Sequence, residues 1–151
     1  MINYIVNKDT LMLIREDNNG VIYTKDGKIV INKLPTDIIK TSCLYYGSTL
    51  EGRMKFTKDV LGVTYKCPIV VSETDNLIMF PTSCYKDKNC CWICFNQILN
   101  YYMLDKYKIK LIFKNNKEIL IDLPIGTLEK QILRSSRLFA ILNSRKQQNL
   151  V

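Results

Sequence analysis

Apolar and polar side chains alternate between Tyr107 and Leu123, and this pattern constrains the fold more than any other feature of the chain. A period of two residues is typical of a β-strand with one buried face, because successive side chains point to opposite sides. A three-residue loop, 115–117, divides the segment so that apolar positions of one strand oppose apolar positions of the other. The pattern therefore predicts an antiparallel hairpin with strands at about 107–114 and 118–123.

The same register pairs charges on the polar face of the hairpin. Lys114 faces Glu118, and Lys110 faces Asp122. Each pair contributes only about 0.2–1 kcal/mol, but together the pairs neutralise much of the basic character of this face. We interpret the polar face as a solvated sheet surface whose charges compensate one another.

Shorter segments with the composition of strands precede the hairpin and are separated by turn residues. They are predicted at Thr10–Glu16, Val21–Lys25, Lys28–Asn32, Ile69–Ser72, Leu77–Phe80 and Trp92–Leu99. Helical signals predict helices at Thr49–Leu61 and Leu128–Leu142, with a helical turn at Asp37–Cys43. We expect an α+β fold: a single DNA-binding domain over residues 1–151, with an antiparallel β-sheet built from hairpins and two main α-helices.

The size and hydrophobicity of the chain support a single core. Of its 151 residues, 47% are hydrophobic, which is enough for one core and too little for two comfortable domains. No apolar stretch approaches the roughly 20 residues of a membrane span, and no signal peptide is visible. We expect a cytoplasmic protein without membrane contact, and six reduced cysteines fit that compartment.

The helix predicted at 49–61 has clear end signals and carries three basic side chains. Ser48 and Glu51 have the S-x-x-E spacing of a capping box, and Gly62 lies where the helix should stop. Gly52 in mid-helix indicates close approach by another backbone, a ligand or DNA, with tight helix–sheet packing as the alternative. The basic residues are Arg53, Lys55 and Lys58.

Apolar side chains lie on both sides of this helix. Leu50 and Met54 belong to one apolar side of the helix. Phe56 and Val60 lie with Arg53 on nearly the opposite side. Such a helix is either packed between two layers or presents an aromatic and arginine face to a partner. The pattern alone leaves both possibilities open.

The positive charge of the chain is concentrated near its C-terminus. The formal net charge is +8, and residues 101–151 hold ten basic and four acidic side chains, a net of +6. Residues 1–40 and 41–100 each have a net charge of only +1. A concentrated positive charge is typical of proteins that bind nucleic acid. The alternative is a lysine-rich surface that reflects an AT-rich genome.

The last helix gathers four of these charges on one face. At about 100° per residue, its basic side chains fall within an arc of roughly 80°. They are Lys130, Arg134, Arg137 and Arg145, opposite Leu128, Ile132, Ser135, Phe139 and Leu142. No acid is placed four residues away from Arg134 or Arg137. Because guanidinium groups suit phosphates and narrow minor grooves, this face is a candidate DNA-binding surface, and a merely solvated helix face is the alternative.

The sequence gives little support to catalysis or metal binding. It has no His, the commonest general base, and no P-loop, G-x-S-x-G or dinucleotide-binding motif. Four cysteines lie within residues 84–94, but a strand at Trp92–Leu99 turns Cys91 away from Cys90 and Cys94. We predict no enzyme activity, no cofactor and no stoichiometric zinc, with a four-thiolate zinc site as the alternative.

Four blocks of sequence resemble one known family. They are Tyr46–Arg53, Pro68-Ile69, Phe80–Thr82 and Trp92-Ile93. Their order and spacing, within about 42–142, resemble the ComK family of competence transcription factors. The resemblance implies a multimer that recognises AT-rich boxes in double-stranded DNA, largely through the minor groove, and activates genes for DNA uptake. It also implies association with the nucleoid and control of the protein level by a proteolysis adaptor.

The candidate DNA-binding residues come from helix geometry and not from this resemblance. They are Arg53, Lys55, Lys58, Lys130, Arg134, Arg137 and Arg145. The alternative function is a non-catalytic protein-interaction module that uses a sheet edge or the face around Phe56, with its basic surface only solvated. Binding that weakens strongly with salt favours the DNA-binding function, since counterions are released from phosphates.

Overall fold

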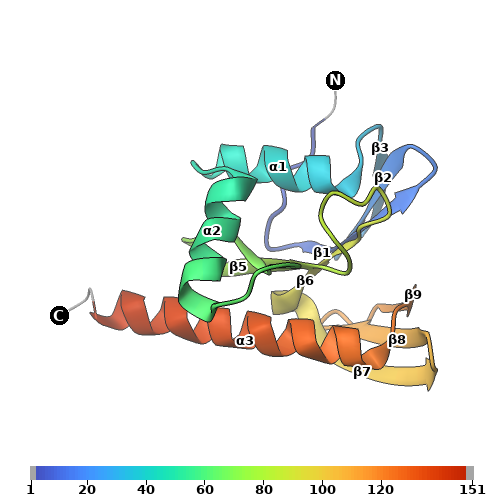
Figure 1. Cartoon of the computed structure of the whole chain (residues 1–151). Helices are drawn as coiled ribbons and strands as arrows, with labels where there is room; N and C mark the ends of the chain where they lie inside the picture. The colour runs from blue at the N-terminus through green and yellow to red at the C-terminus, as the bar shows by residue number, and fades with distance from the viewer. Residues whose placement is uncertain (1–2, 149–151) are drawn as a thin grey trace.

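Two antiparallel sheets form the β-structure of residues 3–148, the part of the chain that the computed structural model describes (Figure 1). The larger sheet has the strand order β3-β2-β1-β6-β5-β4, and the smaller has the order β7-β8-β9. The strands of the larger sheet are β1 (Thr10–Glu16), β2 (Asn19–Thr24), β3 (Gly27–Ile31), β4 (Ile69–Ser72), β5 (Leu77–Pro81) and β6 (Trp92–Cys94). Those of the smaller are β7 (Ile98–Asp105), β8 (Lys108–Phe113) and β9 (Glu118–Asp122).

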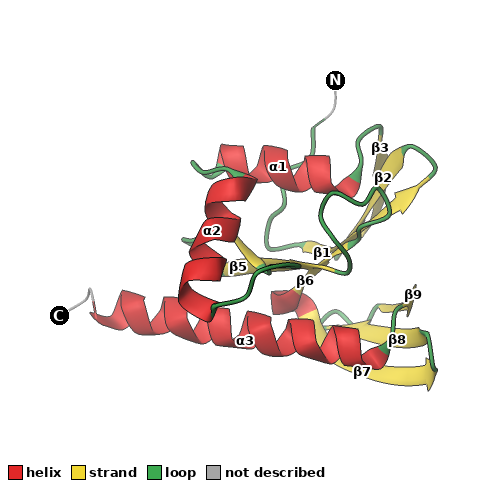
Figure 2. Ribbon diagram, viewed as in Figure 1, coloured by secondary structure: helices red, strands yellow, loops and turns green. Residues whose placement is uncertain are grey.

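In the described part of the chain, helices lie on both sides of the larger sheet and at one end of it, as Figure 2 shows. They are α1 (Pro35–Tyr45), α2 (Leu50–Leu61) and α3 (Ile125–Gln148). In Figure 1, α1 lies above the sheet, α3 lies below it, and α2 connects the two layers at one end. The smaller sheet packs beside the first turns of α3. Among residues 3–148, none of the helices combines the length and apolarity needed to cross a membrane.

The two faces of the larger sheet bury different hydrophobic clusters. Leu13, Ile22 and Trp92 pack toward α1, together with Ile38 and Ile39 of that helix. The opposite face contributes a second cluster, which joins the larger sheet to the smaller sheet and to the start of α3. Its fully or largely buried members are Leu11, Met12, Phe80, Ile93, Ile109, Leu111, Phe113, Leu123 and Leu128.

The α+β class and the hairpin architecture predicted from the sequence are confirmed, but residues 3–148 form three α-helices and two sheets. The predicted helical turn at 37–43 is the eleven-residue helix α1. Pro35 stands at its start, where a missing N–H costs nothing. Ile38, Ile39 and Cys43 recur with helical spacing and are fully buried, so packing extends the helix.

The predicted strand Trp92–Leu99 is wrong in its second half. β6 ends at Cys94, a 3₁₀ turn covers Phe95–Gln97, and the chain then enters β7, which the sequence did not predict. The cause is Asn96, whose Oδ1 accepts the N–H of Ile78 at 2.8 Å and whose amide donates to the carbonyl of Asn76 at 2.8 Å. A side chain thus replaces the backbone ladder and releases the chain from the larger sheet.

The hairpin of β8 and β9 forms, with a register two residues from the predicted one. Lys110 lies opposite Leu120 and forms an ion pair with Glu118 at 3.3 Å, so the predicted pairs of Lys110 with Asp122 and Lys114 with Glu118 are wrong. The loop is 114–116, because Asn116 adopts a φ of 68°. A three-residue hairpin loop ends on a left-handed residue, and Asn tolerates that conformation better than Lys117 would.

The N-cap of α2 is Thr49 and not the predicted Ser48. The Thr49 hydroxyl accepts the N–H of Gly52 at 2.9 Å, and Gly62 ends the helix with a φ of 71° as predicted. A side chain at Gly52 would meet only the Thr49 and Ser48 hydroxyls, at 3.1 and 3.2 Å. Among the described residues no other backbone and no strand approaches Gly52 this closely, so the predicted approach of a backbone and tight helix–sheet packing at this glycine are both wrong. Approach by a ligand or DNA stays a prediction.

Candidate nucleic-acid interface

The basic side chains of α3 form a line beside its buried face. Leu128, Gln131, Ser135, Leu138 and Leu142 are the buried residues of the helix. Ile132 and Phe139, expected on the packed side, are only half-buried, because the buried face is rotated toward α2. We call Lys130, Arg134, Arg137 and Arg145 the α3 stripe; it runs along the edge of the helix that borders α2.

The loop between α2 and β4 is fixed against the first half of the α3 stripe. Buried Gln131 donates from Nε2 to the carbonyls of Lys66 at 2.8 Å and Pro81 at 2.7 Å. Arg134 donates to the carbonyl of Tyr65 at 3.2 Å and to Oε1 of Gln131 at 3.3 Å. These bonds hold the loop and the helix as one surface.

Tyr65 is the centre of the positive cluster on this surface. The residue is 57% exposed. The charged groups of Lys130 and Arg134 each lie 5.7 Å from the ring centroid, and that of Lys66 lies 6.0 Å from it. Each cation–π contact of this kind contributes about 0.5–1 kcal/mol at an exposed site. Three cations are therefore held around one accessible aromatic ring.

The other end of the α3 stripe is anchored to α2 and to the turn between β4 and β5. The guanidinium of Arg145 lies 5.5 Å from the centroid of the Phe56 ring. Lys146 donates from Nζ to the carbonyl of Glu73 and to Oδ1 of Asn76, and Asn76 donates to Asn143 at 2.8 Å. Lys146 is thus used to hold the helix, while Arg145 stays exposed at the surface.

Arg137 differs from its neighbours in the α3 stripe. It is exposed, and no side-chain hydrogen bond or ring contact involves it within residues 3–148. The ion pairs found in that range involve no member of the α3 stripe. The stripe therefore keeps its positive charge uncompensated, as the sequence predicted for Arg134 and Arg137.

The three basic residues predicted on α2 have three different environments. Lys58 is exposed. Burial raises the pKa of the Cys67 thiol, and the charges of Lys58 and Arg134 oppose that rise. Lys55 is exposed and forms an ion pair with Asp59 at 3.4 Å.

Arg53 is half-buried, and its Nε has no hydrogen-bond partner among residues 3–148. It lines a cavity of about 190 Å³ together with Phe56 and Leu142. Phe56 and Val60 pack with Leu138 and Leu142, so α2 lies between two layers, which was the first of the two arrangements left open by the sequence.

Sequence reasoning missed Tyr65 and Lys66. Both lie in a segment without regular structure between α2 and β4, where no periodicity marks an exposed aromatic residue as part of a surface. The only signal in the sequence is an aromatic residue directly followed by a lysine. The position of Tyr65 and Lys66 against α3 depends on Gln131, a polar residue in the middle of the predicted helix.

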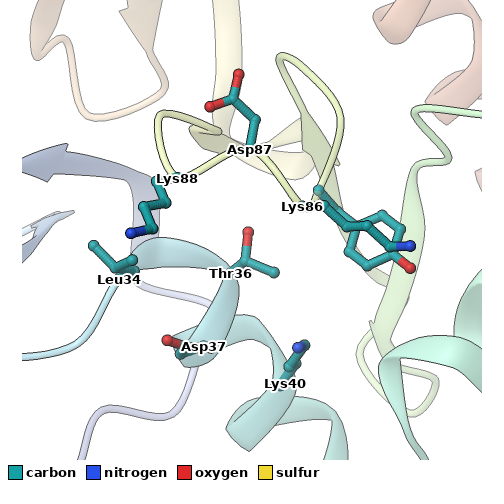
Figure 3. A pocket seen from close by; sticks show the side chains of 8 residues that line it. Leu34, Thr36, Asp37, Lys40, Lys86, Asp87 and Lys88 are labelled. Carbon is teal, nitrogen blue, oxygen red and sulfur yellow. The ribbon is translucent and has the colours of Figure 1, made fainter.

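A separate cavity of about 250 Å³ lies between the start of α1 and the loop that follows β5 (Figure 3). Figure 3 shows the carboxylate of Asp87 pointing away from α1. The cavity is lined by Leu34, Thr36, Asp37, Lys40, Tyr85, Lys86, Asp87 and Lys88. Because two carboxylates accompany its three ammonium groups and α1 covers the opposite face of the sheet from α3, it does not extend the basic surface.

The cysteines near β6 point to opposite sides of the sheet, as the sequence predicted. Cys90, Trp92 and Cys94 belong to the cluster under α1, whereas Cys91 lines a cavity on the other face. Burial raises the pKa of the Cys94 thiol to about 12. Within residues 3–148, no group of three Cys, Asp or Glu side chains is arranged to hold a metal ion.

Comparisons with known proteins agree with the resemblance seen in the sequence. The family model described as ComK protein matches residues 1–147, which extends the likeness through the first hairpins. The chain is 26% identical over 138 residues to the competence transcription factor of Bacillus subtilis (strain 168), and the match covers 89% of this chain and 72% of that protein. No solved structure matches the chain.

Proposed function

This chain belongs to the ComK family, a family of competence transcription factors without enzyme activity, and on that premise we propose that it recognises AT-rich boxes in double-stranded DNA, largely through the minor groove and as a multimer. The observation that supports the proposal most directly is the uncompensated positive surface formed by the α3 stripe, Tyr65 and Lys66. Cytoplasmic, nucleoid-associated action and control by a proteolysis adaptor belong to the same proposal.

The individual side chains have distinct proposed roles. Lys58, Lys66 and Lys130 neutralise phosphates and release counterions, which gives affinity without sequence preference. Arg137, the least restrained guanidinium of the α3 stripe, enters the minor groove and neutralises a flanking phosphate there, because the narrow groove of A-tracts attracts arginine. Arg145 stays on the DNA side of Phe56 and contacts a phosphate.

The remaining two predicted residues have weaker roles in this proposal. Lys55 contributes little, because its charge is shared with Asp59. Arg53 supports the packing of α2 on α3 as well as any contact with DNA, since it is half-buried beside Phe56.

The first prediction concerns the salt dependence and base composition of binding. If about four to six phosphates are neutralised per protomer, the logarithm of the association constant should fall with log[salt] with a slope of about −4 to −5. A gel-shift titration with AT-rich and GC-rich duplexes across several salt concentrations measures both quantities. We expect a clear preference for the AT-rich duplex, and equal affinities or a flat salt response would falsify the proposal.

A pair of double variants locates the surface. Lys130→Ala with Arg137→Ala removes two exposed charges of the α3 stripe and should flatten the salt slope by about two. Lys8→Ala with Lys110→Ala removes the same formal charge from residues that already have carboxylate partners, Asp75 and Glu118. Equal losses for the two double variants would assign binding to general attraction by a basic protein and not to this surface.

A further inference from the structure

Exposed apolar side chains gather on β7 and on the turn that follows it. Leu99, Tyr102, Met103, Leu104 and Tyr107 are each between 49% and 58% exposed. Figure 1 shows β7 as the outermost strand of the smaller sheet, on the side away from β9. A run of large apolar side chains along an open sheet edge is unusual for a surface that meets only water.

The backbone of β7 also has free hydrogen-bonding groups along this edge. Lys114 donates its N–H to Gln97 on the β7 side of β8, and Phe113 donates its N–H to Lys117 on the β9 side. Because the direction alternates along a strand, Asn100 and Tyr102 bond to β8 while Tyr101 and Met103 direct their backbone groups outward. Within residues 3–148, the N–H of Tyr101 donates to Oδ1 of Asn100 at 2.8 Å and has no backbone partner, so on the N–H side of this edge the free group is that of Met103.

The edge of β7 is the least protected of the sheet edges in the described chain. Natural edge strands are usually short or carry lysine or proline, but β7 has eight residues and contains no Lys, Arg or Pro. β3 is shorter and carries Lys28, and β4 is buried throughout. β9 is tied to the turn between β2 and β3 through Lys117, which donates to the carbonyl of Thr24 at 3.2 Å.

We propose that β7 pairs antiparallel with β7 of a second copy of this chain, so that two three-stranded sheets join into one sheet of six strands around a two-fold axis. Charge complementarity favours a second copy as the occupant. Asp105 ends β7, Lys114 lies beside its beginning, both are exposed, and neither forms an ion pair within residues 3–148. Antiparallel pairing places Asp105 of each copy near Lys114 of the other, and the two-fold axis repeats this contact on both sides of the interface.

The second copy also contacts the surface next to the β7 edge. A cavity of about 380 Å³ lies between the beginning of β7 and α3, and its lining includes Leu99, Ile132 and Phe139. Pairing centred on Tyr102 places Leu104 of the second copy opposite Asn100, which also lines this cavity. The join therefore buries apolar side chains in addition to forming backbone hydrogen bonds.

This interface deepens the proposed multimer, and its test needs no DNA. Sedimentation velocity on the full chain should show reversible self-association. Met103→Pro should weaken that association at least about tenfold, because the lost N–H points to the open edge, where proline is tolerated without loss of a β7–β8 bond. Tyr102→Lys should act similarly by setting like charges against each other. Circular dichroism and thermal melting confirm that each variant is folded.

The matched control is Val30→Lys on the edge of β3, where Val30 is 56% exposed and Tyr102 is 52% exposed. This control should leave self-association unchanged. A charge exchange adds a positive test: Asp105→Lys should weaken association, and adding Lys114→Asp in the same chain should restore it. A wild-type protein that is monomeric at every concentration, or equal effects of Val30→Lys and Tyr102→Lys, would overturn the proposal.

The two proposals fail separately. If β7 is the interface, monomeric variants should still bind a duplex with a single AT-rich box and keep the salt slope per protomer. Loss of the preference for AT-rich DNA with self-association intact would contradict only the DNA-binding proposal. Self-association that Met103→Pro and Tyr102→Lys leave intact would contradict only the assignment to β7.

Discussion

Arg134 and Arg137 carry the same charge on neighbouring turns of α3, but they differ in their contacts with the rest of the protein. Arg134 bonds to the carbonyl of Tyr65 and lies over its ring, so it holds the α2–β4 loop in place. Arg137 has no such contacts within the described residues, and it is the side chain that we propose enters the minor groove. A charge count along the helix treats the two residues as equivalent, whereas contacts with a loop distant in sequence separate them.

We predict that Arg137→Ala and Arg134→Ala have different effects on stability. Arg137→Ala should flatten the salt slope of DNA binding by about one and leave the melting temperature unchanged, since it removes only a free charge. Arg134→Ala should weaken binding and also lower stability by about 1 kcal/mol, because a hydrogen bond and a cation–π contact are lost. Thermal melts beside gel-shift titrations measure both; a stability loss for Arg137→Ala that matches the loss for Arg134→Ala would refute this division.

At the scale of single elements, local patterns predicted which segments form strands and helices better than they predicted registers and ends. Two-residue alternation identified the hairpin of β8 and β9, since burial of one face enforces that period. The alternation is equally satisfied by registers two residues apart, so it could not choose between loops 114–116 and 115–117. The conformation of Asn116 makes that choice. β7 was missed because Asn96 interrupts the strand pattern through a contact with β5.

The loop at 114–116 leads to a separate prediction about residue 116. Asn116→Gly should change stability little, since glycine adopts a φ of 68° without steric cost. Asn116→Ala should cost about 1 kcal/mol, because a left-handed backbone brings Cβ close to the following carbonyl. Urea unfolding of the two variants measures the difference. Equal stabilities would mean that residue 116 is not what sets the loop.

At the scale of the whole molecule, the sequence predicted the class of fold and the concentration of charge, but not the surface that presents it. The α3 stripe could be predicted because it depends only on helical geometry. Tyr65 and Lys66 join it because Gln131, fully within the core, bonds to two carbonyls from distant segments. Neither the positions of long-range polar contacts nor the packing of α2 between two layers follows from periodicity, because each depends on which faces meet.

The core itself should respond to alkaline pH. Burial raises the pKa of Cys43 to about 11 and that of Cys94 to about 12, from an ordinary value of 9.0. Below pH 9 both thiols stay protonated in the folded and the unfolded chain, and their full contribution to stability is present. Between about pH 9 and pH 11 only the unfolded chain ionises them, so each thiol should lower the free energy of unfolding by about 1.4 kcal/mol per pH unit.

Alanine variants isolate this effect from other groups that titrate at high pH. Cys94→Ala should be less stable than the wild type at neutral pH, because it leaves a cavity in the core. The difference in the free energy of unfolding between the wild type and Cys94→Ala should become smaller as the pH rises above 9, since the variant has no thiol at this position to ionise on unfolding. Cys84→Ala, which removes an exposed thiol outside the core, is the control for the substitution itself. Urea unfolding at several pH values measures this difference. A difference in stability between the wild type and Cys94→Ala that stays constant with pH would show that burial does not keep the thiol protonated.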